Sequence, residues 1–406
     1  MLIMDDLEIY SPAEDSYLLQ KFVRRLATGR VLDMGTGSGI QALTAIGVPS
    51  VREVVAVDIN PKAVESLNLE IEKRKLRKIK AVQGDLFESV GGFFNLVIFN
   101  PPYLPQDKGI EDAALYGGKK GWEISELFFQ SVSGHLFPDG VVLFLFSTLT
   151  NKQKIEEILD HNLLQWEELG EEKIAFERLY VYKVTKTPLL RQLEGKLLRR
   201  IHYFAEGKRG IVYTSEFDKN LLIKKQIPVK KRTITVAVKV KKKDSKSADA
   251  IASEVRWLKI LNERNIGPKM LFSGEEYVAY EFAEGDYIEG WLPDASKEDS
   301  SKILRSVFQQ CYVMDKLQVN KEEMHHPLKH IIVGKNLDAT LIDFERCYET
   351  EKPHNVTQFA DYIGKHRPLL VKKGFDFSLK ELREAAAKYK ETYAAKEFER
   401  IVELVK

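Results

Sequence analysis

Hydrophobic positions in the first half of the chain fall into short continuous runs separated by amphipathic stretches. Strands are predicted for residues 29–34, 54–58, 79–84, 94–99 and 140–146. Helices are predicted for residues 40–43, 61–75 and 124–135. The run at 94–99 shows no alternation of polar and apolar positions, which is typical of a parallel strand buried on both faces. Strands that alternate with helices at this spacing predict a doubly wound α/β domain.

A different pattern begins near residue 190 and predicts a separate α+β domain. Strands are predicted for residues 207–212, 221–225, 233–240, 277–282, 331–333 and 339–344. Helices are predicted for residues 191–204, 248–265, 300–317 and from 378 onward, with an exposed lysine-rich loop at 239–246. Residues 1–190 contain 21 Lys and Arg against 27 Asp and Glu, whereas residues 191–406 contain 41 against 33. Pattern and charge together predict one domain over residues 1–188 and another over residues 189–406.

Composition excludes several classes of protein. The two cysteines, Cys311 and Cys347, are too few for a disulfide framework or an all-cysteine zinc site. No apolar stretch is long enough for a membrane-spanning helix, and the acidic first residues do not resemble a signal peptide. We therefore expect a cytoplasmic protein with no membrane contact. The mildly basic second half could contact nucleic acid, although a solvated surface explains the same charge.

Three glycines follow the first predicted strand and precede a helix. Gly35, Gly37 and Gly39 lack a Cβ atom, so a ligand can approach their backbone closely. Asp58 ends the next strand, where a carboxylate can accept hydrogen bonds from both ribose hydroxyls of a nucleoside. This pair of features would serve a dinucleotide equally well, and it also occurs as a plain turn in α/β domains.

Asp85 follows the third predicted strand. Together with the backbone of Leu86 it is placed to reach the amino group of an adenine ring. The alternative is that Asp85 only caps the strand end or the following helix.

The segment after the fourth strand reads Asn100-Pro101-Pro102-Tyr103. The Asn side chain offers one acceptor and two donors, the prolines fix the backbone, and the Tyr ring offers a flat stacking surface. Such a segment can hold a planar –NH2 group against the methyl group of a sulfonium. The alternative interpretation is a proline-rich turn without a ligand.

At this point the chain resembles a known family. Asn-Pro-Pro-Tyr is similar to the motif of methyltransferases that modify glutamine amides or adenine amines. Tyr10–Ser16 resembles the Tyr-x-Pro-Ala-Glu-Asp-Thr segment of the HemK/PrmC-like release-factor glutamine methyltransferases, and Gly117–Glu123 resembles their Gly-Gly-x-x-Gly segment. The resemblance covers about residues 7–185. It points to the short archaeal and eukaryotic type, which has no helical N-terminal domain.

The resemblance implies a Rossmann-like class I methyltransferase with S-adenosylmethionine as its cofactor. The cofactor would be held by Ser16, Asp33, Gly35, Gly37, Gly39, Asp58, Asp85, Leu86 and Asn100. Asn100, Pro101, Pro102 and Tyr103 would hold the acceptor. The implied acceptor is the glutamine of the Gly-Gly-Gln motif in a class I translation release factor, and the implied partner is a small zinc-binding activator that covers an apolar sheet edge. Adenine in nucleic acid and a protein lysine are the alternative acceptors.

The second half resembles the protein-kinase-like superfamily, particularly its atypical archaeal and RIO-like branches. Lys239 ends a strand, Glu254 follows on a helix, and Asp343 ends a later strand. A Lys–Glu pair with a metal-binding Asp is the apparatus that holds ATP phosphates and magnesium. Asp343-Phe344-Glu345 is similar to the motif of choline-kinase-type enzymes. The resemblance covers about residues 200–350 and implies a site for ATP and Mg²⁺.

The catalytic loop of this half departs from the kinase pattern. His325 stands where the catalytic Asp is expected, and His330 stands where a metal-binding Asn is expected. The turn 207–210 is also poor in glycine. His325 could orient a hydroxyl and His330 could lie near a metal ion. An active kinase, a pseudokinase and a regulatory scaffold gated by ATP all fit the sequence.

Overall fold

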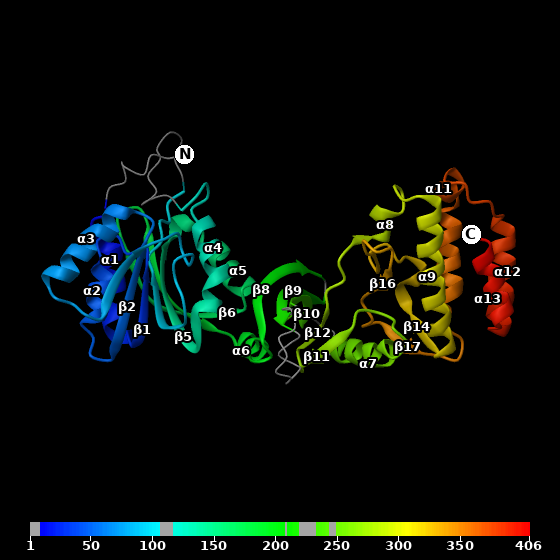
Figure 1. Ribbon diagram of the computed structural model, residues 1–406, viewed down its shortest axis with the longest axis horizontal. Coiled ribbons are helices and arrows are strands. Elements are labelled where there is room, and N and C mark those ends of the chain that lie inside the picture. Colours follow the sequence, from blue (N-terminus) through cyan, green and yellow to red (C-terminus); the bar gives the residue numbers. More distant parts are fainter. Residues whose placement is uncertain (1–8, 106–116, 208, 219–232, 243–248) are drawn as a thin grey trace, which may run out of the picture. The chain divides into compact units, whose positions relative to one another are not determined.

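The structure is a computed structural model that describes residues 9–105, 117–207, 209–218, 233–242 and 249–406. The chain folds into two compact units, Met1–His202 and Tyr203–Lys406 (Figure 1). The predicted strand at 221–225 lies outside the described residues. Each unit has its own sheet and its own core, as the change of pattern near residue 190 predicts.

A seven-stranded sheet forms the centre of the first unit, in the order β3-β2-β1-β4-β5-β7-β6. Its strands are β1 (Gly29–Met34), β2 (Val51–Asp58), β3 (Ile79–Gln83), β4 (Phe94–Phe99), β5 (Leu136–Ser147), β6 (Leu164–Lys173) and β7 (Arg178–Lys186). The strands from β3 to β5 run parallel, whereas β7 pairs antiparallel with both β5 and β6. The strand order reverses between β1 and β4, and at such a switch point the loops at the carboxyl ends of the strands diverge and leave a crevice.

Helices cover both faces of this sheet (Figure 1). They are α1 (Glu14–Leu26), α2 (Ile40–Ile46), α3 (Pro61–Lys73), α4 (Glu123–Val132) and α5 (Lys152–His161), with short 3-10 turns η2 (Ser133–His135) and η3 (Thr148–Thr150). Helix α3 begins as its sequence predicts, because Pro61 occupies the first turn and the Asn60 side chain accepts a hydrogen bond from the Lys62 N–H. Strand β4 is buried along its length apart from Asn95, as expected for a strand covered on both faces.

The predicted helix over residues 191–204 is wrong. Helix α6 (Pro188–Gly195) is short, and Leu198–Glu206 forms strand β8 instead. Leu197 has a left-handed φ of 66°, which ends the helical path. Helix α6 packs in the first unit, where Glu194 forms a 2.6 Å ion pair with Lys186 of β7. The division between the units falls after His202, within β8, whereas the sequence pattern predicts a boundary at residue 188.

The second unit contains a five-stranded sheet in the order β11-β12-β10-β9-β8. Its other strands are β9 (Gly210–Asp218), β10 (Thr233–Lys241), β11 (Met270–Ser273) and β12 (Tyr277–Glu281). The pairings of β9 with β10, β10 with β12 and β11 with β12 are antiparallel. Helix α7 (Ala250–Asn262) packs against β10, β11 and β12. The sheet face toward α7 carries Val278, which lies opposite Lys239 in the register and belongs to the same core as Trp257 and Leu258 of α7.

The rest of the second unit is mostly helical. Its helices are α8 (Ile288–Trp291), α9 (Lys297–Lys316), α10 (Asn355–Lys365), α11 (Arg367–Lys372), α12 (Leu379–Thr392) and α13 (Ala395–Glu403), with the 3-10 turn η5 (Glu322–His325). Short strands β13 (Asp286–Tyr287), β15 (Ile331–Val333) and β16 (Ala339–Leu341) form one small sheet, and β14 (Val319–Lys321) pairs with β17 (Cys347–Glu349). Both cysteines are buried and free. Within the described residues, no helix has the length and apolar character needed to cross a membrane.

Candidate functional site

A pocket of about 250 Å³ opens at the carboxyl ends of β1, β2 and β4. It is lined by Asp15, Ser16, Asp33, Gly35, Gly37, Asp58, Asp85, Leu86, Asn100, Pro101, Pro102 and Tyr103, among others. The topology thus brings together nearly all of the residues singled out in the first half of the sequence. Gly39 does not line the pocket. It has a left-handed φ of 80° at the start of α2, and a Cβ atom there would lie 2.6 Å from Leu67, so the turn itself requires this glycine.

Asp33 holds the glycine turn in place by hydrogen bonds to the turn and to helix α2. Its Oδ2 accepts hydrogen bonds from the Thr36 hydroxyl at 2.6 Å and from the Ala42 N–H at 3.0 Å. The carboxyl is almost completely buried, and this desolvation raises its pKa to about 7. The resemblance assigns Asp33 to the cofactor. The structure shows that one of its oxygens is already used by the protein.

Asp58 links the second strand to the same turn. Its Oδ2 accepts the Gly37 N–H at 2.7 Å and its Oδ1 accepts the Asn60 N–H at 2.9 Å. Burial raises the pKa of this carboxyl as well. Each oxygen has a second lone pair, so Asp58 can still accept hydrogen bonds from a ligand such as a ribose. Asp85 and Leu86 also line the pocket, and Leu86 adopts a left-handed φ of 44°.

Asn100 is held in one orientation by a residue far away in the sequence. Its Nδ2 donates a 2.8 Å hydrogen bond to Oδ2 of Asp15, at the start of α1. The other oxygen of Asp15 accepts the Ser16 N–H, and the Tyr10 hydroxyl donates to the same carboxylate at 3.1 Å. Because the carboxylate accepts only from the NH2 side, the Asn100 amide must place Oδ1 on the opposite side. That Oδ1 is buried and has no partner within the described residues.

Asp15 and Tyr10 complete the hydrogen-bond network around Asn100, and the sequence predicts no individual role for either residue. The sequence predicts a role for Asp15 only as part of the Tyr10–Ser16 segment. No local pattern predicts its contact with Asn100, which lies 85 positions later. Asp15 is buried, and burial together with the Asp15 charge raises the pKa of the Tyr10 hydroxyl. Tyr10 therefore remains a hydrogen-bond donor to Asp15 over the ordinary pH range.

The Gly-Gly-x-x-Gly segment supports the Asn-Pro-Pro-Tyr loop. The Gly117 N–H donates to the Leu104 carbonyl at 3.0 Å. A Cβ atom on Gly117 would lie 2.4 Å from the Pro102 carbonyl oxygen, and one on Gly121 would lie 2.6 Å from that of Tyr103. These glycines are thus required because the two backbones pack directly against each other.

The comparisons with known proteins agree with this geometry. The model of the methyltransferase small domain family matches residues 14–174. A protein from Methanocaldococcus jannaschii, whose name assigns it N5-glutamine methyl transfer, is 37% identical over 181 residues, which are 43% of this chain and 90% of that protein. The first unit belongs to the HemK-like methyltransferase family.

Human methyltransferase HEMK2 is 30% identical over 195 residues, which are 44% of this chain and 91% of HEMK2. One chain in a solved structure of the Mtq2–Trm112 complex of E. cuniculi is 27% identical to this protein. The match covers 98% of that chain and 44% of this one, with a TM-score of 0.36. The two relatives that are 37% and 30% identical confirm, for the first unit, the resemblance predicted from three sequence segments. These relatives do not extend over the second half of the chain, so its kinase-like character stays a prediction.

The pocket residues fit the cofactor of HemK-like methyltransferases, S-adenosylmethionine. Asp58 and Asp85 offer carboxylates at two neighbouring strand ends, which suits the hydroxyl and amino groups of a nucleoside. The glycine turn presents backbone instead of side chains. The buried Asp33 carboxyl suits a ligand with a positive charge, because a nearby cation stabilises the ionised carboxylate.

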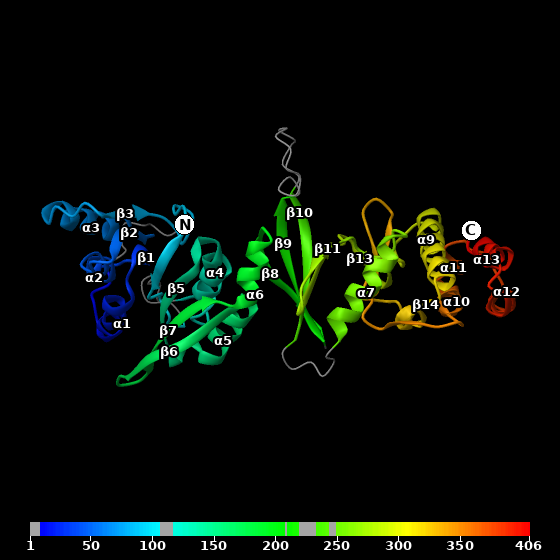
Figure 2. The same ribbon diagram turned by 90° about the horizontal axis from the view of Figure 1, so that it is seen from below.

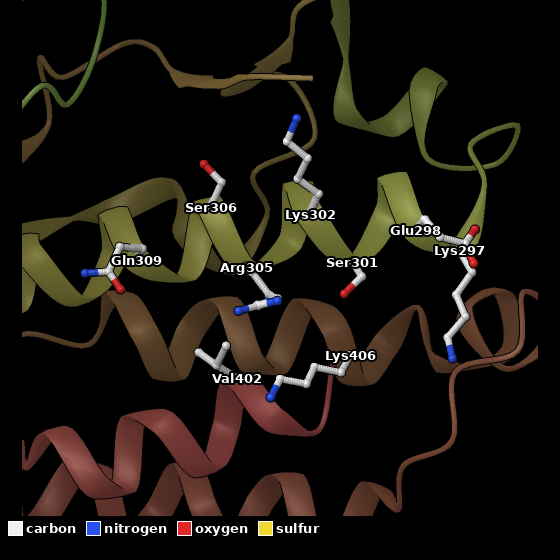
Figure 3. A pocket seen from close by; sticks show the side chains of 9 residues that line it. All are labelled: Lys297, Glu298, Ser301, Lys302, Arg305, Ser306, Gln309, Val402 and Lys406. Carbon is white, nitrogen blue, oxygen red and sulfur yellow. The ribbon is translucent and has the colours of Figure 1, made fainter. Parts of the chain in front are cut away.

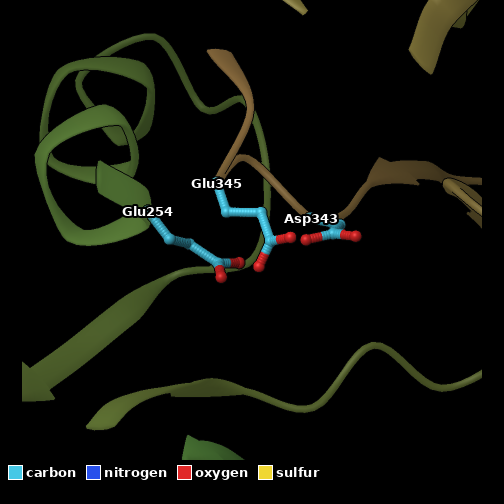
Figure 4. A group of neighbouring side chains, drawn as sticks. All are labelled: Glu254, Asp343 and Glu345. Atoms are coloured by element: carbon cyan, nitrogen blue, oxygen red, sulfur yellow. The ribbon is translucent and has the colours of Figure 1, made fainter. Parts of the chain in front are cut away.

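A second group of polar side chains lies in the second unit (Figure 4). The Lys239 ammonium is 2.7 Å from Glu254, 2.7 Å from Asp343 and 3.1 Å from Glu345. Burial lowers the pKa of Lys239, but the surrounding carboxylates outweigh it and hold the pKa well above its usual value. Glu345 also pairs with Arg209 at 2.7 Å. The sequence predicts that Lys239, Glu254 and Asp343 lie together. It names Glu345 only as part of the Asp343-Phe344-Glu345 motif and gives no role to Arg209.

The two histidines predicted for the site in this unit, His325 and His330, differ in their surroundings. His330 lies near the acidic group, with its Nδ1 3.8 Å from Oδ2 of Asp343, and burial lowers its pKa. His325 is exposed, and its Nδ1 lies 2.9 Å from the Glu322 carbonyl oxygen. Sequence reasoning also missed Lys321, a fully buried lysine whose ammonium contacts Glu323 at 3.0 Å and donates to the Asp343 carbonyl.

The second unit also has an open groove of about 620 Å³ beside helix α9 and the C-terminal residues (Figure 3). It is lined by Lys297, Glu298, Ser301, Lys302, Arg305, Ser306, Gln309, Val402 and Lys406. The groove is larger than the methyltransferase pocket but contains none of the predicted site residues. Its charged side chains extend into solvent, where their interactions are screened.

We expect that replacing Asp15 by Asn lowers the methyl-transfer rate about a hundredfold, because misplacement of a reacting group by about 1 Å has an effect of this size. An amide at position 15 can donate as well as accept, so the Asn100 side chain can turn and present NH2 where Oδ1 was. Cofactor affinity should stay within about threefold, because neither Asn100 nor its backbone is removed. Asp139→Asn, an exposed site on β5, is the matched control. An equal loss of cofactor affinity in Asp15→Asn contradicts the positioning role.

The raised pKa of Asp33 predicts a pH dependence of cofactor binding. A sulfonium cation lowers the pKa of a nearby carboxyl, so binding below pH 7 must displace a proton from Asp33, whose pKa in the free protein is about 7. Affinity for S-adenosylmethionine should rise with pH up to about 7 by less than tenfold per pH unit, and then level off. Calorimetry from pH 5.5 to 8.5 measures this. Asp33→Asn should remove the slope, and S-adenosylhomocysteine, which has no sulfonium, should show a smaller one. An unchanged slope in the variant assigns it to another group.

Proposed function

We propose that the first unit methylates the side-chain amide of a glutamine in a protein. The observation that carries this proposal is the Asn100 Oδ1, buried in the pocket wall and fixed as an acceptor by Asp15. A primary amide has two N–H donors, and one of them can donate to this oxygen. The names of several relatives support the same acceptor: a release factor glutamine methyltransferase of Deinococcus radiodurans and a ribosomal protein uL3 glutamine methyltransferase of Bordetella pertussis.

The chemistry requires little from the protein beyond orientation. The cofactor supplies an electrophilic methyl group on sulfur. Asn100 would hold the amide nitrogen toward this methyl group; on transfer the sulfur would keep the electron pair of its bond to the methyl, and the nitrogen would release one proton to solvent. An amide nitrogen is a weak nucleophile because its lone pair is delocalised into the carbonyl. A hydrogen bond from its N–H to Asn100 Oδ1 would increase the electron density on nitrogen, and the fixed loop would hold the amide in one orientation.

For the protein substrate we propose the glutamine of the Gly-Gly-Gln motif in a class I release factor. A pocket that opens at a loop-lined sheet edge is accessible to a tip of another folded protein. A ribosomal protein, an adenine base and a lysine amine are the other acceptors that an experiment must separate. A lysine ammonium group differs from an amide because it must lose a proton to a base before it can attack. Among the described pocket residues, Asp15 already accepts three hydrogen bonds, so it is poorly suited to be that base.

We also propose the small zinc-binding activator as a partner, seated on the edge of the sheet formed by β3. Among the described residues β3 has a sheet neighbour on only one side. Exposed apolar side chains lie on neighbouring segments, with Leu69 on α3 at 61% and Ile59 at the end of β2 at 42%. A partner that pairs with β3 would cover both.

For the second unit we propose a nucleotide site centred on Lys239, Glu254 and Asp343, with Mg²⁺ as the accompanying cation. Support comes from the Lys239–Glu254 ion pair between a sheet strand and helix α7, and from Asp343, which also pairs with Lys239. Figure 4 shows Glu254 and Asp343 with the neighbouring Glu345. Lysine can neutralise phosphate oxygens and the acidic side chains can hold a cation. His330 is near enough to Asp343 to contribute to that cation site. Phosphoryl transfer, silent binding and gating of methyl transfer are the three outcomes that the site allows.

The acceptor can be identified by transfer of a radiolabelled methyl group to a purified archaeal release factor, with and without the zinc-binding activator. We expect label on the wild-type factor and none on a factor whose Gly-Gly-Gln glutamine is replaced by alanine. Asn100→Ala should abolish transfer and leave cofactor affinity intact, because the amide oxygen contacts the acceptor. Label on ribosomal protein or nucleic acid instead, with none on the factor, overturns the proposed substrate.

The nucleotide site can be tested by thermal unfolding with ATP and Mg²⁺. Ligand at 100 times its Kd stabilises the folded state by about 2.7 kcal/mol, so we expect a clear upward shift of one unfolding transition. The shift should vanish in Lys239→Ala, measured against that variant's own melting temperature without nucleotide. Lys241→Ala, two residues further along β10, is the control and should respond like the wild type. An equal shift in both variants counts against Lys239.

A further inference from the structure

The tip of the β6–β7 hairpin carries the most exposed large apolar side chain among those described. Phe176 is 96% exposed, in the four-residue connection between Lys173 and Arg178. Figure 2 shows the strands β6 and β7 that this connection joins. Isolated exposed apolar residues are common on soluble proteins. This one stands at a defined place, because its connection is tied to the loop that forms the acceptor end of the pocket.

Two hydrogen bonds connect the hairpin to that loop through the turn η3. The Arg178 N–H donates to the Thr148 hydroxyl at 3.1 Å. The Thr150 hydroxyl donates to the Tyr103 carbonyl at 3.2 Å. The connection itself is closed by a 3.0 Å hydrogen bond from the Ile174 N–H to the Glu177 carbonyl. The Ile174 side chain packs against the core of the first unit, so Phe176 is held outward by a fixed support.

Other exposed apolar side chains flank the same place. Leu149, the middle residue of η3, is 44% exposed. Tyr17 on α1 is 53% exposed. It lies one helical turn before Lys21, whose ammonium is 3.5 Å from Glu172 near the end of β6. Hairpin, turn and helix α1 thus each contribute one exposed apolar side chain around the loop that holds Asn100.

Two carboxylates give this surface its charge. Burial and the charge of Asp15 are the main causes of the raised pKa of Tyr10 and Tyr103. Glu14 and Glu177 lie close enough to both hydroxyls to make smaller contributions to the same rise in pKa. Both tyrosines line the pocket, so the two acids stand near its mouth. Neither acid has an ion-pair partner within the described residues, unlike Glu171 and Glu172 further along β6, which pair with Arg178 and Lys21.

We infer that Phe176, Leu149 and Tyr17, with Glu14 and Glu177, form a docking surface for the polypeptide that carries the acceptor glutamine. The occupant is a segment with an apolar side chain that covers Phe176 and a Lys or Arg side chain that faces the two acids. This inference rests on the proposed function, since it takes the acceptor to be a protein. It adds that the protein recognises residues of the substrate that flank the glutamine and that do not enter the pocket.

The decisive experiment compares a folded release factor with a short Gly-Gly-Gln peptide as acceptors, using the full chain. Phe176→Ala should raise KM for the folded factor about tenfold or more, the effect of removing a central aromatic contact. The value of kcat, the affinity for S-adenosylmethionine and KM for the peptide should not change. Phe93→Ala is the matched control, because Phe93 is 48% exposed and precedes β4, at the opposite strand end from Asn100.

Glu177→Gln tests the charge separately. It should weaken binding of the folded factor at low salt and reduce the dependence of KM on ionic strength, since a screened attraction is lost. If the wild-type protein methylates the factor and neither Phe176→Ala nor Glu177→Gln changes KM, the docking surface is refuted and the proposed function stands. If the wild-type protein methylates neither the factor nor the peptide, the proposed function fails and the docking surface fails with it.

Discussion

The hydrogen bond between Asp15 and Asn100 is the constraint on which the methyltransferase site depends. A buried carboxylate must be satisfied by donors, and Asp15 finds them in the Ser16 N–H, the Tyr10 hydroxyl and the Asn100 amide. Each charge-assisted bond of this kind contributes about 1.5–3 kcal/mol, and leaving the carboxylate unsatisfied costs more. The N-terminal segment is thereby fixed to the loop after β4, and the same contact determines which face of the Asn100 amide meets the acceptor.

Sheet topology explains why residues spread over the first hundred positions meet in one pocket. Parallel strands place all their carboxyl ends at one edge, so the turn after β1, Asp58 after β2 and Asn100 after β4 become neighbours. This much follows from the sequence, because continuous apolar runs identify buried strands and each motif directly follows one. The contact between Asp15 and Asn100 does not follow, because hydrogen bonds between distant segments leave no periodic pattern. Nor does the hydrophobic pattern predict β6, whose many acidic positions suit an exposed edge hairpin more than a buried strand.

The error at residues 191–204 has a similar origin. Basic residues in that stretch favour a helix, but the left-handed backbone of Leu197 ends α6, and pairing with β9 stabilises Leu198–Glu206 as a strand. Tertiary pairing outweighs local propensity there. In the second unit the motif spacing correctly brings Lys239, Glu254 and Asp343 together. Arg209 could not be found in this way, since its pairing with Glu345 joins positions 136 residues apart.

The methyltransferase pocket and the polar group around Lys239 differ in how far they are preorganised for a ligand. In the first unit the protein satisfies every polar atom of Asp15 and leaves an acceptor on Asn100 free, so a donor gains a hydrogen bond without breaking one. In the second unit three carboxylates surround the Lys239 ammonium, and the pairing that holds its pKa high also occupies it. An anionic ligand that takes this ammonium must weaken its bonds to Asp343 or Glu345, and a cation is needed to compensate the carboxylates left behind. Nucleotide and cation should therefore bind to the second unit together, whereas the methyltransferase pocket is organised before its ligands arrive.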